Sequence, residues 1–227
     1  MFRYSYDLGA KREGRPGRLA GGFSLVEVLV VLAIIAILTA TAVPAISSTM
    51  RAYQLETTSQ TVVNQLALAR QSALSINQCV EVRFYYLPDY NQPASATPAV
   101  YRAMQCFSQG APTASGTSVL TPLTKPCFFP APIIVSMAIS PNPVSPILST
   151  LPATPATTDL SLPVYGSNYR YSSFQFKPNG SAGSLSSTSN SMTLVIQNDA
   201  LGSTGLPKNY VTLQVDPLVG TVRAFRP

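Results

Sequence analysis

The chain has 227 residues, of which 46% are apolar and only 11% are charged, whereas an average soluble domain carries about 25% charged residues. It contains no histidine, so the commonest general base and the commonest zinc ligand are absent. The net charge of +6 does not indicate a nucleic-acid partner, because half of it lies in the first 22 residues, which hold five basic and two acidic side chains. The composition is untypical of a cytosolic enzyme, and we expect no catalytic residue, metal or cofactor.

The segment 1–22 is basic and Gly-rich and shows no apolar periodicity, so we interpret it as a processing leader. Basic side chains in front of an apolar segment follow the positive-inside rule, which keeps such a leader in the cytoplasm. The rest of the chain would then cross the membrane.

The segment 23–43 is apolar on all sides of a helix, with neither Gly nor Pro inside it after Phe23. At 1.5 Å per residue it is about 31 Å long, enough for a hydrocarbon core of about 30 Å. We therefore predict a single membrane-spanning helix. Its one charged residue is Glu27, and a charge in hydrocarbon costs roughly 2.5–3.5 kcal/mol even on lenient insertion scales.

Pro44 ends the apolar segment, and a helix kink is predicted there because proline removes a backbone hydrogen bond. In the segment 44–76 the pattern becomes amphipathic, which predicts that its apolar stripe packs on a globular domain. The stripe has spacings of three, four and seven residues and consists of Leu55, Val62, Leu66, Ala69, Ala73 and Ile76. Asn77 is the expected stop of the helix.

The segment 77–227 is predicted to be a β-rich head. Its part 88–163 holds 14 of the 20 prolines and is expected to be a long loop excursion with short edge strands, because proline donates no ladder hydrogen bond. Alternation and turn residues predict the following strands: Cys79–Leu87, Ala99–Phe107, Ile133–Ile139, Tyr171–Lys177, Ser191–Gln197, Tyr210–Val215 and Gly220–Phe225.

The three cysteines are Cys79, Cys106 and Cys127, and their spacing matches no metal motif. In an oxidising compartment the default is one disulfide and one free thiol. Sequence alone does not fix the connectivity; Cys106–Cys127 is the pair we predict.

The residues Gly22-Phe23-Ser24-Leu25-Val26-Glu27, between a basic leader and an apolar helix, resemble the prepilin signature of type IV pilins and type II secretion pseudopilins. Pro44 also lies where many pilins carry a proline. The resemblance implies cleavage between Gly22 and Phe23 by a prepilin peptidase, followed by methylation of the new amine at Phe23. It also implies association with other pilin or pseudopilin subunits through the N-terminal helix.

Two further stretches extend the resemblance. Residues 65–74 (QLALARQSAL) and 174–180 (FQFKPNG) are similar to the helix–sheet junction, and to the central strand and turn, of minor pseudopilin H and FimT-like proteins. Residues 80–85 (VEVRFY) and the ending 206–227 resemble the Verru_Chthon cassette protein D family of Verrucomicrobia. The fold implied is α+β and pilin-like, with a long N-terminal helix packed on an antiparallel β-sheet head.

Two interpretations of Glu27 stay open. Cleavage would create an ammonium at Phe23, and Glu27 lies one helical turn along, so it can pair with that group in its own chain or in a neighbour. A paired buried carboxylate is tolerated because pairing offsets desolvation, and in a fibre the pair would set the axial register. The simpler interpretation places Glu27 in the headgroup layer, where an acid favours the start of a helix.

We therefore expect a non-enzymatic minor pilin or pseudopilin-like subunit, anchored in the bacterial inner membrane with its head in the periplasm. One alternative is DNA uptake, because some FimT-like pilins bind DNA through a basic C-terminal segment; Lys208, Arg223 and Arg226 would then contact phosphates. The simpler interpretation of these cations is a solvated hairpin end. Another alternative is an anchored periplasmic protein that never polymerises.

Overall fold

The computed structural model describes residues 22–89, 99–112, 118–136, 145–148, 153–154, 160–167, 169–197 and 207–227. The chain divides into two compact units, Met1–Ile46 and Ser47–Pro227. One helix of 52 residues, α1 (Leu25–Ile76), contributes to both units. Its end at Ile76 agrees with the sequence, since Asn77 adopts a left-handed backbone conformation with φ of 53° that stops a helix.

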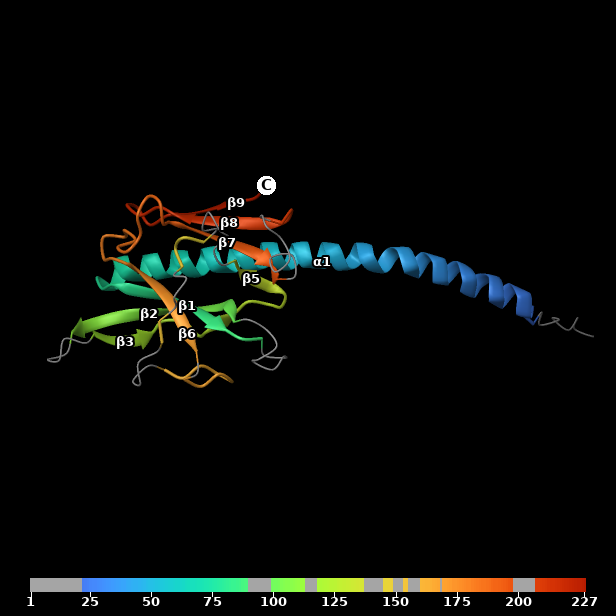
Figure 1. The fold of residues 1–227 in the computed structure, drawn as a ribbon, viewed down its shortest axis with the longest axis horizontal. Coiled ribbons are helices and arrows are strands. Elements are labelled where there is room, and N and C mark those ends of the chain that lie inside the picture. The colour runs from blue at the N-terminus through green and yellow to red at the C-terminus, as the bar shows by residue number, and fades with distance from the viewer. Residues whose placement is uncertain are drawn as a thin grey trace, which may run out of the picture. The chain divides into compact units, whose positions relative to one another are not determined.

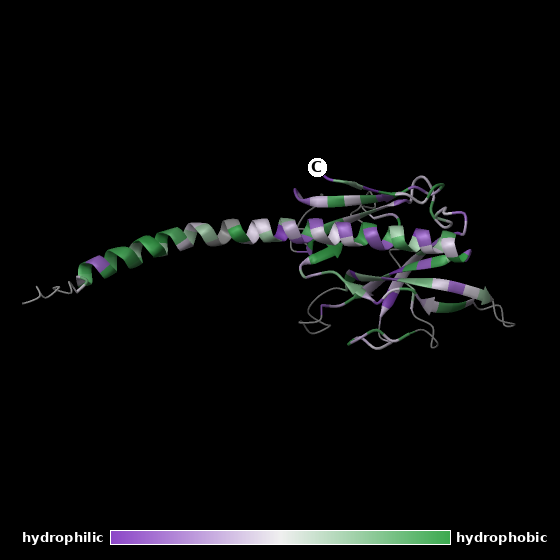
Figure 2. Cartoon of the chain, turned by 180° about the vertical axis from the view of Figure 1, so that it is seen from behind, coloured by the Kyte–Doolittle hydropathy of each residue, from purple (hydrophilic) through white to green (hydrophobic). Residues whose placement is uncertain are grey.

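The part of α1 in the first unit is almost wholly apolar, and Figure 2 shows it in the colours of hydrophobic residues. The part of α1 in the second unit alternates hydrophobic and hydrophilic residues in the same view. This change of character along one helix is the one that the sequence predicts. Pro44 lies inside α1, at the junction of the two units, and the kink expected there remains a prediction.

In the second unit, nine strands of the described residues form one sheet in which all neighbours are antiparallel. The order along the sheet is β6-β1-β2-β5-β7-β8-β9, while β3 and β4 also pair with β2. The strands are β1 (Val80–Leu87), β2 (Val100–Pro112), β3 (Ser118–Pro122), β4 (Cys127–Phe128), β5 (Ile133–Val135), β6 (Arg170–Phe176), β7 (Ser191–Ile196), β8 (Tyr210–Val215) and β9 (Val222–Phe225).

The sheet encloses the C-terminal half of α1. In Figure 1, β7, β8 and β9 lie on one side of that half, and β1, β2 and β6 lie on the other. A single apolar core joins α1 to strands from both sides. The predicted stripe faces this core with no exposed surface, through Leu55, Val62, Leu66, Ala69 and Ala73.

Ile76 is an exception to the predicted stripe, because it is 41% exposed. It is the last residue of α1, and the chain turns away at Asn77, so no further turn of helix shields it. The helical period therefore predicts correctly which face of α1 packs on the sheet. It does not predict the residue at which the sheet stops covering that face.

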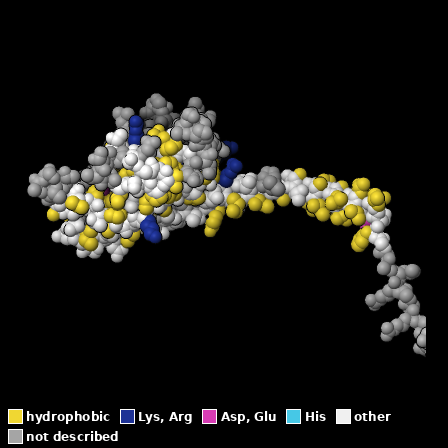
Figure 3. All heavy atoms as spheres, turned by 90° about the horizontal axis from the view of Figure 1, so that it is seen from below, with side chains coloured by type: hydrophobic (Ala, Val, Ile, Leu, Met, Phe, Trp, Pro, Cys, Tyr) yellow, Lys and Arg dark blue, Asp and Glu magenta, His cyan; other side chains and the backbone are white. Residues whose placement is uncertain are grey.

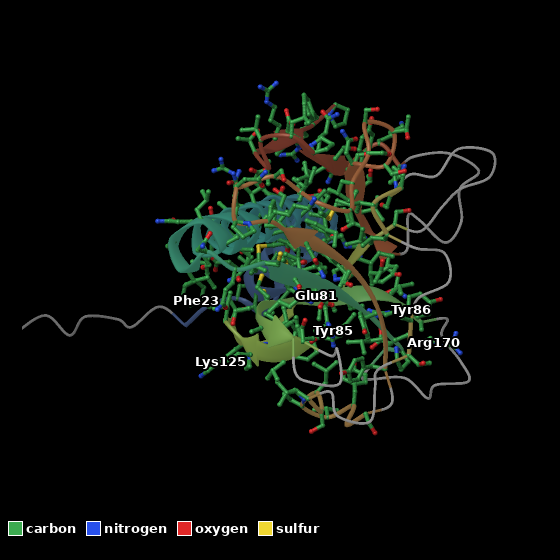
Figure 4. All side chains as sticks on the ribbon, turned by 90° about the vertical axis from the view of Figure 1, so that its left-hand side faces the viewer. Phe23, Glu81, Tyr85, Tyr86, Lys125 and Arg170 are labelled. Carbon is green, nitrogen blue, oxygen red and sulfur yellow. The ribbon has the colours of Figure 1, made fainter. Side chains whose placement is uncertain are left out.

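β1 is buried on both faces. Val80, Val82 and Phe84 belong to the core around α1, while Tyr85 and Leu87 belong to a second apolar cluster. Figure 4 shows Tyr85 and Tyr86 along this strand. Alternation in the sequence separates the two faces but does not reveal that the second face is also covered.

The Pro-rich interval contains the short strands β3, β4 and β5, as expected, but it also contains β2. The prediction of short edge strands is wrong for β2, which has 13 residues and pairs with β1, β3, β4 and β5. The strand predicted at Ile133–Ile139 is realised as Ile133–Val135, and residues 137–144 lie outside the described part of the chain. The resemblance to a central strand at 174–180 is wrong in its position, because β6 lies at one end of the sheet order. Its turn is as predicted, with Gly180 at φ of 82°.

Candidate processing and assembly site

The N-terminal end of α1 is built from Ser24 and Glu27. The helix begins at Leu25, so Ser24 takes the N-cap position and Glu27 the third helical position. The carbonyl oxygen of Ser24 accepts the first helical hydrogen bond from the amide of Val28 at 3.2 Å. The spacing Ser-x-x-Glu is that of a capping box. Glu27 also lies in the first turn of α1, where an acidic side chain favours the start of a helix.

Gly22 and Phe23 precede the helix in an open setting. A Cβ built on Gly22 would meet no heavy atom within 4 Å, so nothing in the described part of this chain requires a residue without a side chain there. Phe23, labelled in Figure 4, is 80% exposed. The described residues therefore neither require nor exclude a glycine at position 22.

The helix that follows is apolar over its whole surface. Its large side chains from Leu25 to Leu38 are all at least 47% exposed, and Figure 3 shows apolar side chains around this part of the helix. α1 is the one helix among the described residues that is long and apolar enough to cross a membrane. Exposed apolar area on this scale is stable only in lipid or against other apolar surfaces.

The three C-terminal cations predicted as phosphate contacts are not equivalent. Arg226 forms an ion pair of 3.3 Å with Glu56 and donates a hydrogen bond of 3.2 Å to Asn209 Oδ1. Two backbone hydrogen bonds, from the amides of Val219 and Leu218, lower the pKa of the Asp216 carboxyl. The positive charge of nearby Arg223 lowers this pKa further. Two of the three cations thus have carboxylate neighbours, which reduces what they offer to phosphates. DNA contact remains a prediction.

The three cysteines are free thiols in this structure, so the predicted Cys106–Cys127 bridge is not present in it. The two side chains do belong to the same core, with Cys127 packed against its edge. Burial raises the pKa of the Cys106 thiol to about 12, and burial also raises that of Cys127. Among the described residues, no group of three or more His, Cys, Asp or Glu side chains is placed to hold a metal.

Sequence reasoning did not single out a buried ion pair on the outer face of β1. Arg83 Nε donates to Glu81 Oε1 at 2.8 Å, and both side chains are less than 10% exposed. The guanidinium carbon also lies 5.1 Å from the Phe107 ring centre and 4.1 Å from that of Tyr171. The only sequence signal was two opposite charges two residues apart on a strand, and this places them on one face.

Comparison with known proteins gives two findings. Residues 17–43 match the family model described as the prokaryotic N-terminal methylation motif. Among solved structures, the minor pseudopilin EpsH from the type 2 secretion system of Vibrio cholerae is similar, with 11% sequence identity and a TM-score of 0.41 over 77% of this chain and 98% of that one. No curated protein matches the chain. The narrower resemblance to the Verru_Chthon cassette protein D family stays a prediction.

The matched motif covers the residues that carry the processing signature, Gly22, Phe23 and Glu27, together with the apolar half of α1. The second half of α1 packs on an antiparallel sheet, which makes the fold α+β. The chain thus combines the prokaryotic N-terminal methylation motif with a fold in which one long helix packs on an antiparallel sheet.

Proposed function

We propose that the chain is the precursor of a minor pilin or pseudopilin subunit. A prepilin peptidase cuts it between Gly22 and Phe23 and methylates the amine of Phe23, and the mature subunit enters or primes a type IV pilus or a secretion pseudopilus. The observation that carries this proposal is the methylation motif at residues 17–43.

The chemistry of the mature terminus supports a role for Glu27 between subunits. Cleavage places an ammonium at Phe23, one helical turn from the Glu27 carboxylate. An unpaired carboxylate in hydrocarbon costs roughly 2.5–3.5 kcal/mol, and an ammonium from a neighbouring chain offsets that cost once the helices pack together. The pair then fixes how far one subunit is displaced along the fibre relative to the next.

The membrane topology follows from the same parts. The leader stays in the cytoplasm by the positive-inside rule, α1 anchors the mature subunit in the inner membrane, and the head lies in the periplasm. The anchored protein that never polymerises shares this topology, so only assembly separates the two interpretations.

Processing is tested by adding membranes that contain a prepilin peptidase to the full-length chain. We expect the wild-type chain to lose its leader and Gly22→Val to keep it, because a branched side chain blocks access to the backbone at the cut. Gly21→Val is the matched control, since it alters the neighbouring glycine and should still be cut. Equal cleavage of Gly22→Val would contradict the proposed cut site.

A further inference from the structure

A pocket of about 280 Å³ lies in the head, and no residue of α1 lines it. It is lined by Asp89 after β1, Arg102 on β2, and Phe128 and Phe129 at β4, together with Ala131 and the turn that carries Pro163, Val164 and Tyr165. Its volume is near the lower end of the roughly 300–1,000 Å³ found for ligand pockets. A pocket of this size suits a small molecule better than an extended polymer.

Arg102 is the polar centre of the pocket. The residue is 8% exposed, and within the described part of the chain neither its Nε nor its Nη2 has a hydrogen-bond partner. Its nearest counter-charge is Asp89, with Nη2 and Oδ2 3.4 Å apart, which is longer than the ~2.7–2.9 Å of a charge-assisted hydrogen bond. A buried guanidinium is normally satisfied by such bonds, so among the described residues Arg102 Nε makes no polar contact and Nη2 makes only the long ion pair with Asp89.

The two nitrogens without a hydrogen bond determine which ligand group fits. Nε and Nη2 form one edge of the planar guanidinium, and a carboxylate accepts two parallel hydrogen bonds from such an edge. A neutral amide cannot do the same, because its nitrogen is a donor. This edge therefore selects a carboxylate over its uncharged analogue.

The walls of the pocket fit an apolar body attached to that carboxylate. The rings of Phe128 and Tyr165 stack with centres 6.3 Å apart and planes 22° apart. Tyr165 donates a hydrogen bond of 3.2 Å to the carbonyl oxygen of Pro88, which holds the turn against the chain next to Asp89. Phe128 is 42% exposed, so it is the wall that can yield as a carboxylate reaches the buried donors.

The turn at the mouth of the pocket has an unusual backbone. Leu162 and Gly166 exchange two backbone hydrogen bonds, of 2.8 and 2.9 Å, and Val164 between them has φ of 70°. A β-branched residue in this left-handed region is a strained outlier, and such strain concentrates at functional sites. Val164 is also 72% exposed, so it offers apolar surface that a ligand would cover.

We propose that this pocket is a binding site for a small organic carboxylate, held through its carboxylate by Arg102 and through its apolar body by Phe128, Tyr165 and Val164. The site is independent of cleavage and assembly, since it lies wholly within the head. Its test therefore succeeds or fails separately from that of the proposed function.

Phenylacetate and its neutral isostere phenylacetamide are suitable probes, titrated into the full-length chain in detergent and followed by ligand-observed NMR. We expect phenylacetate to bind at least about tenfold more tightly than the amide, which corresponds to about 1.4 kcal/mol. Arg102→Lys should abolish most of that preference, because lysine keeps the charge but lacks the planar fork. Phe128→Ala should weaken both probes equally and leave the preference intact.

Arg170→Gln is the matched control, since Arg170 is an exposed arginine at the start of β6 (Figure 4) outside the pocket lining; it should leave both affinities unchanged. The proposal is overturned by equal affinity for acid and amide, or by no binding of phenylacetate at about 20 mM, well above a millimolar Kd. It is also overturned by an unchanged preference in a folded Arg102→Lys chain. If that variant does not fold, the wild-type preference and its persistence in Phe128→Ala decide.

Discussion

Arg70 Nε, on α1, donates a hydrogen bond of 2.7 Å to the carbonyl oxygen of Val219, in the turn between β8 and β9. The two residues are 149 positions apart in the chain, so this contact fastens the C-terminal hairpin to the helix. Arg70 lies in the QLALARQSAL stretch that resembles minor pseudopilins, which gives that stretch a structural purpose. The turn itself is shaped by Asp216, whose Oδ1 accepts hydrogen bonds from the amides of Leu218 and Val219.

Replacing Arg70 should loosen this hairpin. We expect Arg70→Met to lower the free energy of unfolding by about 1–2 kcal/mol, because a hydrogen bond from a charged donor is lost while the apolar stem is kept. Thermal unfolding in detergent measures the loss, and hydrogen exchange should increase first at β8 and β9. Unchanged exchange in these strands would show that the contact does not hold the hairpin.

Gly220 should tolerate no side chain. Its φ is 72°, and an added Cβ would overlap the carbonyl oxygen of Gly180 and lie 3.2 Å from Arg70 Cδ and from Phe176 Cε1. We expect Gly220→Ala to cost more than about 2 kcal/mol, since backbone strain and a clash with rigid backbone add together. The free energy of unfolding is again the measurement.

Gly166→Ala is the control for that substitution. Gly166 also has a positive φ, of 59°, but a Cβ there would meet nothing within 4 Å. It should cost only about 1 kcal/mol, the cost of backbone strain alone. Equal losses for the two variants would mean that the close approach of the two turns adds nothing.

The loss of stability on removing Glu81 should depend strongly on whether Arg83 is replaced as well. Glu81→Ala leaves the Arg83 guanidinium buried without its 2.8 Å partner, and we expect a loss of about 3–5 kcal/mol. Glu81→Ala combined with Arg83→Met should cost less than that single change, because the uncompensated charge is gone. A double variant less stable than Glu81→Ala would show that the ring contacts of Arg83 dominate.

Cys106 should resist alkylation. Burial raises its pKa to about 12 from 9.0, so near pH 8 it holds about a thousandfold less thiolate than an ordinary thiol, and the thiolate is the reactive form. Its labelling by iodoacetamide should stay slow up to the pH at which the chain unfolds. Peptide mapping without reductant checks this, and a linked Cys106–Cys127 peptide would instead establish the predicted bridge.

Two variants separate the roles of Glu27. Glutamine also serves at the third position of a capping box, so Glu27→Gln keeps the helix start but removes the charge, whereas Glu27→Ala removes both. We expect both variants to insert in the membrane. The amount of each variant in sheared fibres should fall at least about tenfold, which corresponds to a loss of only about 1.4 kcal/mol of assembly free energy. Wild-type behaviour of Glu27→Gln would reduce Glu27 to a helix cap.

The sequence predicted the amphipathic half of α1 and the strand β8 well, because their periodicity depends on the residues themselves. The stripe from Leu55 to Ala73 and the limits of β8 are those that the pattern indicates. The second buried face of β1 and the edge position of β6 depend instead on which distant segments pair, and no local pattern encodes that.

The processing signature and the Arg102 pocket differ in the same way in how far the sequence predicts them. The processing signature is a contiguous motif, so it could be found by reading alone. Arg102 and its pocket come from segments separated by up to 76 positions, from Asp89 to Tyr165, and each of these residues is ordinary in its own stretch. The missing hydrogen-bond partners of Arg102 are visible only in three dimensions.

Mass spectrometry of the N-terminal peptide, from the chain purified out of membranes of a host with a prepilin peptidase, tests the central claim most directly. We expect a peptide that begins at Phe23 and carries a single methyl group on its amine. A peptide that begins at Met1, or at any residue other than Phe23, would contradict it.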